Sequence, residues 1–180
     1  MTVAPHSKRE AVGSLEQFET ERMIARRVKE SDFDALCEMH RDSSVMATLG
    51  GERTTAETRA FLDRNIEHWE TFGFGLWMLE ARGAGELIGR GALRNVVLEG
   101  SAEIEIGYAF FPSHWGKGLA TEIAGEIIAL AFANLSAPSL VSFCLPTNVA
   151  SRRVMEKTGG VFERDIEHAG LPHVLYRFAR

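Results

Sequence analysis

A Gly-Lys-Gly turn at residues 116–118 joins a strand-like segment to a helix-like segment, and this junction constrains the fold more than any other feature of the sequence. Residues 102–110 have the pattern of a strand, and residues 119–134 repeat apolar side chains at helical spacing. The two glycines keep side chains away from the turn, so backbone N–H groups at the start of the helix stay accessible. Because the helix dipole and the lysine of the turn add positive charge, the junction favours a bound phosphate.

Two common phosphate-binding motifs do not fit this turn. A dinucleotide-binding fingerprint needs a third glycine where Thr121 stands, and a nucleoside-triphosphate loop needs glycine at Phe111 and serine or threonine at Gly118. A Gly-Lys-Gly turn by itself is equally compatible with a plain tight turn. Any more specific assignment must therefore come from other parts of the chain.

Composition and charge restrict the class of protein. With 180 residues, 45% of them hydrophobic and 25% charged, the chain predicts one globular domain that buries roughly 70% of the surface its unfolded form exposes. The net charge of −5 argues against general nucleic-acid binding, and no window approaches the ~18 apolar residues of a membrane span. Cys37 and Cys144 lie among apolar residues with no metal-ligand spacing, which favours buried thiols in the cytoplasm and predicts neither a disulfide nor a metal site.

The hydrophobic pattern predicts an α+β fold. We expect residues 1–21 to form a leader outside the domain and residues 22–180 to form the domain itself. Its mixed, mostly antiparallel central sheet should have about seven strands, with helices on both faces. The capping box Thr54-x-x-Glu57 predicts the start of one helix. Strands are expected at 23–28, 74–81, 87–98, 102–110, 140–145, 161–166 and 173–179, and helices near 32–41, 56–71, 119–134 and 149–157.

Two motifs in this order resemble the GNAT acetyltransferase superfamily. Residues 115–120, Trp-Gly-Lys-Gly-Leu-Ala, are similar to its pyrophosphate loop, with tryptophan at the first position as in the branch that resembles ribosomal-protein N-terminal acetyltransferases. Residues 148–159 resemble its second signature, with Asn148, Ser151, Lys157 and Gly159 in place. Together with Glu-Ile-Gly-Tyr at 105–108 and Gly-Phe-Gly-Leu-Trp at 73–77, the resemblance extends from about residue 22 to the C-terminus. It implies the fold of that superfamily and the use of acetyl-CoA as co-substrate.

The resemblance also implies where acetyl-CoA binds. Asn148 would bind the pantetheine arm, although N-capping of its own helix explains it equally well. Arg153 would reach the phosphates, or is a solvated surface residue. In the family a bulge in the strand before the loop separates it from its neighbour, and Gly107 is the candidate position. The pyrophosphate would be held at Trp115, Gly116, Lys117, Gly118, Leu119, Ala120 and Thr121, mainly by backbone N–H groups.

The reaction implied is direct attack of a neutral amine on the thioester, which requires a base to remove a proton. Glu105 and Glu103 share strand parity beside the thioester, so both are candidates, with Glu105 preferred; a solvent-facing carboxylate pair is the alternative. Met155 stands where many relatives have a tyrosine that protonates the departing thiolate. Ser151, one turn earlier, is the substitute candidate, or else only caps the helix. Tyr108 is expected to form a wall of the site.

The acceptor is the least determined part of this prediction. A protein or peptide N-terminus and a small-molecule amine, such as an antibiotic, amino acid or polyamine, both remain open. Acidic residues near the expected substrate rim, Asp42, Glu52 and Glu57, would attract a cationic acceptor. The departure at Met155 also keeps open a non-catalytic acyl-CoA-binding module. A homodimer is a family expectation only.

Overall fold

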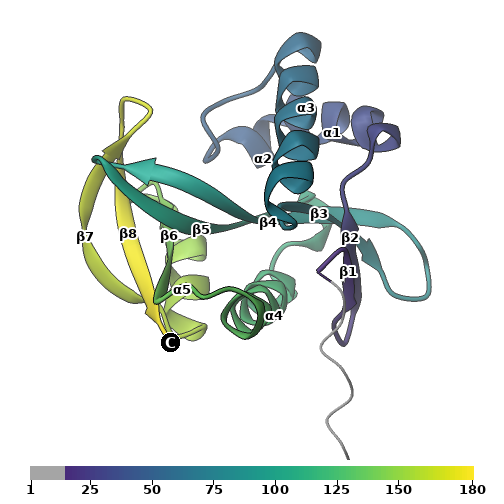
Figure 1. Ribbon diagram of the computed structural model, residues 1–180. Helices are drawn as coiled ribbons and strands as arrows, with labels where there is room; N and C mark the ends of the chain where they lie inside the picture. The colour runs from purple at the N-terminus through teal and green to yellow at the C-terminus, as the bar shows by residue number, and fades with distance from the viewer. Residues whose placement is uncertain (1–14) are drawn as a thin grey trace, which may run out of the picture.

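The computed structural model describes residues 15–180, which form one eight-stranded sheet flanked by helices (Figure 1). The strands are Gln17–Glu19 (β1), Met23–Arg27 (β2), Leu76–Ala81 (β3), Leu87–Leu98 (β4), Ser101–Phe110 (β5), Ser139–Cys144 (β6), Val161–His168 (β7) and Leu171–Ala179 (β8). Their order in the sheet is β1-β2-β3-β4-β5-β6-β8-β7. All neighbouring strands are antiparallel except β5 and β6, which are parallel. The predicted α+β architecture is confirmed.

Two groups of helices cover the two faces of this sheet (Figure 1). The first group is α1 (Phe33–Arg41), α2 (Ser43–Met46) and α3 (Thr55–Phe72), and the second is α4 (Leu119–Asn134) and α5 (Val149–Lys157). Single 3-10 turns, η1 (Glu30–Asp32) and η2 (Pro112–His114), precede α1 and α4. The predicted capping box is present at the start of α3, where Thr54 and Glu57 satisfy each other's backbone N–H groups. The helix bounds therefore follow the local signals in the sequence.

The first strand was not expected. Residues 1–21 were predicted to be a leader; residues 1–14 lie outside the described part of the chain, but β1 pairs with β2 through Phe18 and Ala25. Phe18 is buried, with its ring edge-on to Trp77 at 5.4 Å. The sheet thus has eight strands, where about seven were expected. The strand β1 was not predicted because a three-residue strand with one buried apolar residue is too short to show a period in the sequence.

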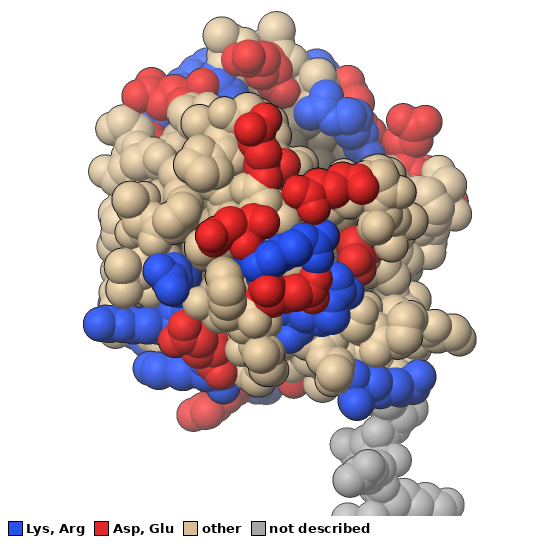
Figure 2. Space-filling model, turned by 90° about the vertical axis from the view of Figure 1, so that its left-hand side faces the viewer, with Lys and Arg blue, Asp and Glu red and all other residues tan. Residues whose placement is uncertain are grey.

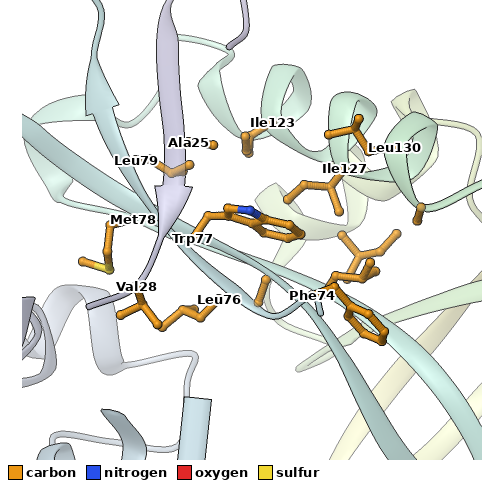
Figure 3. Packing of buried hydrophobic residues seen from close by; sticks show 14 of the residues in the cluster. Ala25, Val28, Phe74, Leu76, Trp77, Met78, Leu79, Ile123, Ile127 and Leu130 are labelled. Atoms are coloured by element: carbon orange, nitrogen blue, oxygen red, sulfur yellow. The ribbon is translucent and has the colours of Figure 1, made fainter. Parts of the chain in front are cut away.

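The main core lies between β3, β4, β5 and helix α4. Trp77 is fully buried on β3 and points toward Ile123 and Ile127 of α4 (Figure 3). Trp69 and Phe74 belong to the same cluster, and the Trp69 indole donates to the backbone oxygen of Leu76 at 2.9 Å. These aromatic side chains are therefore core residues.

The sheet opens between β5 and β6. Their ladder contains one residue pair, Glu105 with Val141, and next to it Ser142 Oγ donates to the backbone oxygen of Ile106 at 2.9 Å. The expectation of a bulge at Gly107 was wrong, because the β4–β5 register runs unbroken over all ten residues of β5. The opening instead arises where β6 leaves the ladder while β5 continues to Phe110. We call this region the β5–β6 opening.

Candidate active site

The glycine turn between β5 and α4 presents a row of backbone donors. Gly116 and Gly118 have φ values of +73° and +78°, in the left-handed region that side chains disfavour. Within the described part of the chain, the N–H groups of residues 116–121 donate to no other group. Trp115 is different, because its N–H donates to Pro112 O at 3.1 Å, so the prediction that this N–H is available was wrong. The remaining six N–H groups lie at the positive end of α4, where helix geometry favours an anion.

Arg22 lies beside this turn and was not identified from the sequence. Its Nη1 donates to the backbone oxygen of Lys117 at 2.7 Å, and its Nε donates to Glu122 at 2.6 Å. Thr20 Oγ1 also donates to Glu122 at 2.6 Å. Burial opposes the charged form of Glu122, but the hydrogen bonds from Thr20 and Arg22 outweigh it and lower the pKa of that carboxyl. The network fixes the turn and places a guanidinium next to Gly118, within 3.6 Å of where a Cβ would stand.

Across the β5–β6 opening, two hydroxyl groups meet. The Tyr108 hydroxyl from β5 lies 3.0 Å from Ser151 Oγ of α5 and 3.3 Å from the Ser151 backbone oxygen. Burial raises the pKa of Tyr108, so its hydroxyl stays protonated at neutral pH. Asn148 Oδ1 accepts from the N–H of Ser151 at 3.1 Å, so Asn148 is the N-cap of α5, one of the two roles considered for it. Tyr108, expected only as a wall, therefore brings a proton donor to the opening.

The other predicted residues of α5 divide into buried and exposed. Met155 is 1% exposed, and its side chain packs in the main hydrophobic core. Arg153 lies exposed on α5, whereas Arg152 donates to Tyr176 Oη at 3.3 Å. Cys144, at the end of β6, is buried, and burial raises the pKa of its thiol. Like Cys37, it is unpaired, as the sequence predicted.

Glu103 and Glu105 lie on the face of the sheet that α1, α2 and α3 cover, and each pairs with an arginine. Glu105 is 5% exposed and accepts from Arg94 Nε at 2.5 Å, and its charge raises the pKa of Arg94. Glu103 accepts two hydrogen bonds from Arg177, at 2.8 and 3.0 Å. Arg177 also pairs with Glu163 of β7. Glu103 is thus held in an ion-pair network, whereas Glu105 lies at the closed end of the β5–β6 opening.

Acidic and basic side chains interleave over the side of the molecule formed by β7 (Figure 2). Ion pairs connect β7 to its surroundings: Arg164 of β7 pairs with Glu99 in the turn between β4 and β5, and Glu163 of β7 pairs with Arg177 of β8. Within residues 15–180, no three His, Cys, Asp or Glu side chains come together in a way that would hold a metal ion. No helix in the same range combines the length and apolar content that crossing a membrane requires.

His40, near the end of α1, is fully buried. Its Nδ1 lies 3.0 Å from Thr58 Oγ1 and its Nε2 lies 3.3 Å from Arg53 Nη1. Burial, together with the charges of Arg90 and Arg53, lowers the pKa of His40 to about 3. The imidazole is therefore neutral at physiological pH and has a partner for each nitrogen, which indicates a structural role.

Comparison with known proteins identifies the family. The family model for the acetyltransferase (GNAT) domain matches residues 22–161. The chain is 31% identical over 142 residues to YnaD, an uncharacterised N-acetyltransferase of Bacillus subtilis (strain 168), and the match covers 78% of this chain and 79% of YnaD. The crystal structure of an acetyltransferase from Agrobacterium tumefaciens str. C58 has a TM-score of 0.81 and 26% identity, covering 97% of this chain and all of that one.

A ribosomal L7/L12 α-N-protein acetyltransferase, RimL, in complex with coenzyme A, has a TM-score of 0.72 and 18% identity; the match covers 89% of this chain and 95% of RimL, and it shows the shared fold. The chain belongs to the GNAT acetyltransferase family. It is an acetyl-CoA-dependent N-acetyltransferase, and the resemblance seen in its two motifs is confirmed.

Proposed function

We propose that this enzyme transfers the acetyl group of acetyl-CoA to a primary amine by direct attack within a ternary complex. The observation that carries the proposal is the β5–β6 opening, which lies between two kinds of groups. On the side of α4 and α5 are anion-binding N–H groups and the Tyr108–Ser151 hydroxyl pair. On the opposite face is the buried carboxylate of Glu105. A thioester in the opening would have a proton donor near its sulfur and a proton acceptor near the incoming amine.

The co-substrate would be held chiefly by the turn. Pyrophosphate oxygens would accept from the N–H groups of residues 116–121, while Arg22 and Lys117 add positive charge. Arg153 is placed on the exposed side of α5, where a phosphate could reach it. The pantetheine arm would enter the opening beside β5, where the ladder to β6 has ended. Asn148, although it caps α5, keeps its amide NH₂ for this arm.

Glu105 is the base in this proposal. An ammonium ion has no free electron pair, so the acceptor must lose a proton before its nitrogen bonds to the carbonyl carbon. Arg94 neutralises the charge of the buried Glu105 carboxylate, and an ionised carboxylate can only accept hydrogen bonds, directly from the amine or through a water molecule. Glu103 is the weaker candidate, because both of its oxygens already accept from Arg177.

The departing sulfur needs a partner as the C–S bond breaks. Ser151 and Tyr108 lie together at the opening, and the Tyr108 hydroxyl can pass a proton to the thiolate directly or through Ser151 Oγ. Because a thiol has a pKa near ~8.5, its anion is a tolerable leaving group and this donor contributes less than the base. The pair takes the role of the tyrosine that is absent at Met155.

The test is thiol release from acetyl-CoA with a panel of peptide N-termini and small amines, in the wild type, Glu105→Gln and Glu103→Gln. We expect Glu105→Gln to lower kcat by about 100-fold or more, with the Kd for acetyl-CoA unchanged. Glu103→Gln, the matched control, should lose stability through its broken ion pairs but keep most of its turnover. Full turnover in Glu105→Gln would remove it from the base role. Tight acetyl-CoA binding with no transfer to any amine would favour a non-catalytic binding module.

A further inference from the structure

Two arginines near the proposed acceptor side lie over the same aromatic ring. The guanidinium of Arg90, from β4, lies over the ring of Phe61 at 5.0 Å, and that of Arg53 lies over the same ring at 4.9 Å. Arg90 Nε is buried and bonds to no group in residues 15–180. Neither arginine forms a salt bridge with any residue of that range. Two like charges are thus held close together in a poorly solvated place.

This arrangement is unfavourable in the protein alone. Burial, together with the charges of Arg53 and Arg94 and against the charge of Glu105, lowers the pKa of Arg90 to about 9. The guanidinium is still protonated at neutral pH. Buried charges in proteins are normally paired, and an unpaired one costs free energy. The charge of the Glu105 carboxylate raises the pKa of Arg90, but this carboxylate already accepts a hydrogen bond from Arg94. The cluster therefore has an excess of positive charge that a bound anion would neutralise.

The strand register places this cluster beside the proposed base. On the face below α1 to α3, Arg90 pairs with Ala109, and Arg94 pairs with Glu105. Between them the pair Ala92 and Gly107 has almost no side chain, and a Cβ on Gly107 would meet only the Cβ of Ala92, at 3.9 Å. Arg90 and Glu105 are four strand positions apart along the sheet, which is about 13 Å between their backbones, and their side chains shorten this separation enough for the charge of Glu105 to raise the pKa of Arg90.

We infer that the acceptor carries a carboxylate close to its amine, and that Arg90 and Arg53 bind this carboxylate while the amine lies at Glu105. The inference rests on the proposed acetyl transfer and narrows its substrate class. A free amino acid or an acidic residue at a peptide N-terminus would supply this chemistry. A cationic acceptor, expected from Asp42, Glu52 and Glu57, has less support because the side chains of Asp42 and Glu57 cap helices.

Turnover of matched acceptors tests this recognition. Amino acids should have kcat/KM values at least about tenfold higher than their amides, which keep the amine but lack the negative charge. In Arg90→Met the ratio of kcat/KM for the amino acid to kcat/KM for its amide should fall to near one. Arg64→Met, which removes an exposed charge from the same neighbourhood, should retain it. An unchanged preference in Arg90→Met, or a wild type that prefers amides, overturns the inference. Acidic-first peptides accepted in place of amino acids would assign the carboxylate to a peptide.

Stability and binding give a test that needs no turnover. Because the Nε of Arg90 is buried and has no hydrogen-bond partner in residues 15–180, Arg90→Met should raise the Tm of the unliganded protein, whereas loss of a purely structural arginine would lower it. With saturating coenzyme A, an N-acetyl amino acid should raise the Tm of the wild type more than its amide does, and should lose this effect in Arg90→Met. If Arg90→Met fails to fold, Arg53→Met serves the same test. A lower Tm together with unchanged binding of the N-acetyl amino acid would show a structural role and contradict the inference.

Discussion

The change Tyr108→Phe isolates the proton donor proposed for the departing thiolate. The substitution keeps the ring in the β5–β6 opening and removes only the hydroxyl, which lies 3.0 Å from Ser151 Oγ. The lost hydrogen bond should lower the free energy of unfolding by about 0.5–1.5 kcal/mol. General acids contribute about 10²–10⁴ to rates, and a thiol of pKa near ~8.5 needs little help, so kcat should fall by roughly 10- to 100-fold.

The chain offers a matched control for this change in its other tyrosine. The Tyr176 hydroxyl, from β8 and thus two strands away from β5, donates to Glu156 at 2.8 Å, so Tyr176→Phe makes the same chemical change away from the Tyr108–Ser151 pair. The assay is thiol release at saturating acetyl-CoA and amine. Combining Tyr108→Phe with Ser151→Ala should cost less than the product of the single effects, because the two hydroxyls act together. If Tyr108→Phe and Tyr176→Phe keep the same kcat, the reasoning about the donor is refuted.

Two further predictions concern the glycine turn and the buried histidine. Gly118→Ala should lower the free energy of unfolding by about 1–2 kcal/mol, because the φ of Gly118 is +78°, and should raise the KM for acetyl-CoA. Gly125→Ala, inside α4, should instead raise the free energy of unfolding by about 0.5–1 kcal/mol and leave this KM unchanged. Urea denaturation and initial rates check both, and equal KM values would contradict the role of the turn. The folded-state pKa of His40, about 3, lies below its ordinary 6.5, so its share of stability is complete above pH 6.5 and is lost as pH falls toward 3. His40→Gln should therefore flatten the fall in unfolding free energy between pH 6.5 and 4, by about 1.4 kcal/mol per pH unit at most; parallel curves would show that His40 does not titrate in this way.

Long periodic segments and helix caps could be predicted from the sequence. Residues 119–134 were predicted as a helix and form α4 with the same bounds, and the box at Thr54 starts α3. These features depend on local spacing, which the sequence displays directly. The three-residue strand β1 has one buried apolar side chain and no period, so its pairing with β2 was not predictable.

Parts of the candidate site depend on contacts between distant residues, which one sequence does not display. Arg22 reaches the backbone of Lys117 across 95 positions, and the Tyr108 hydroxyl meets Ser151 across 43. The arginine pair around Phe61 likewise combines β4, α3 and the loop between α2 and α3. The predicted bulge at Gly107 failed for a related reason, because the sheet opens where β6 diverges, without a change in the β4–β5 register.

Direct attack within a ternary complex is the central claim, and initial rates measured while acetyl-CoA and the amine are both varied test it most directly. The proposed geometry places the thioester in the opening and the amine at Glu105, with no nucleophilic protein side chain assigned between them. It therefore predicts double-reciprocal lines that intersect, since both substrates must be bound before either product leaves. Parallel lines would indicate an acetylated enzyme intermediate and would contradict the account.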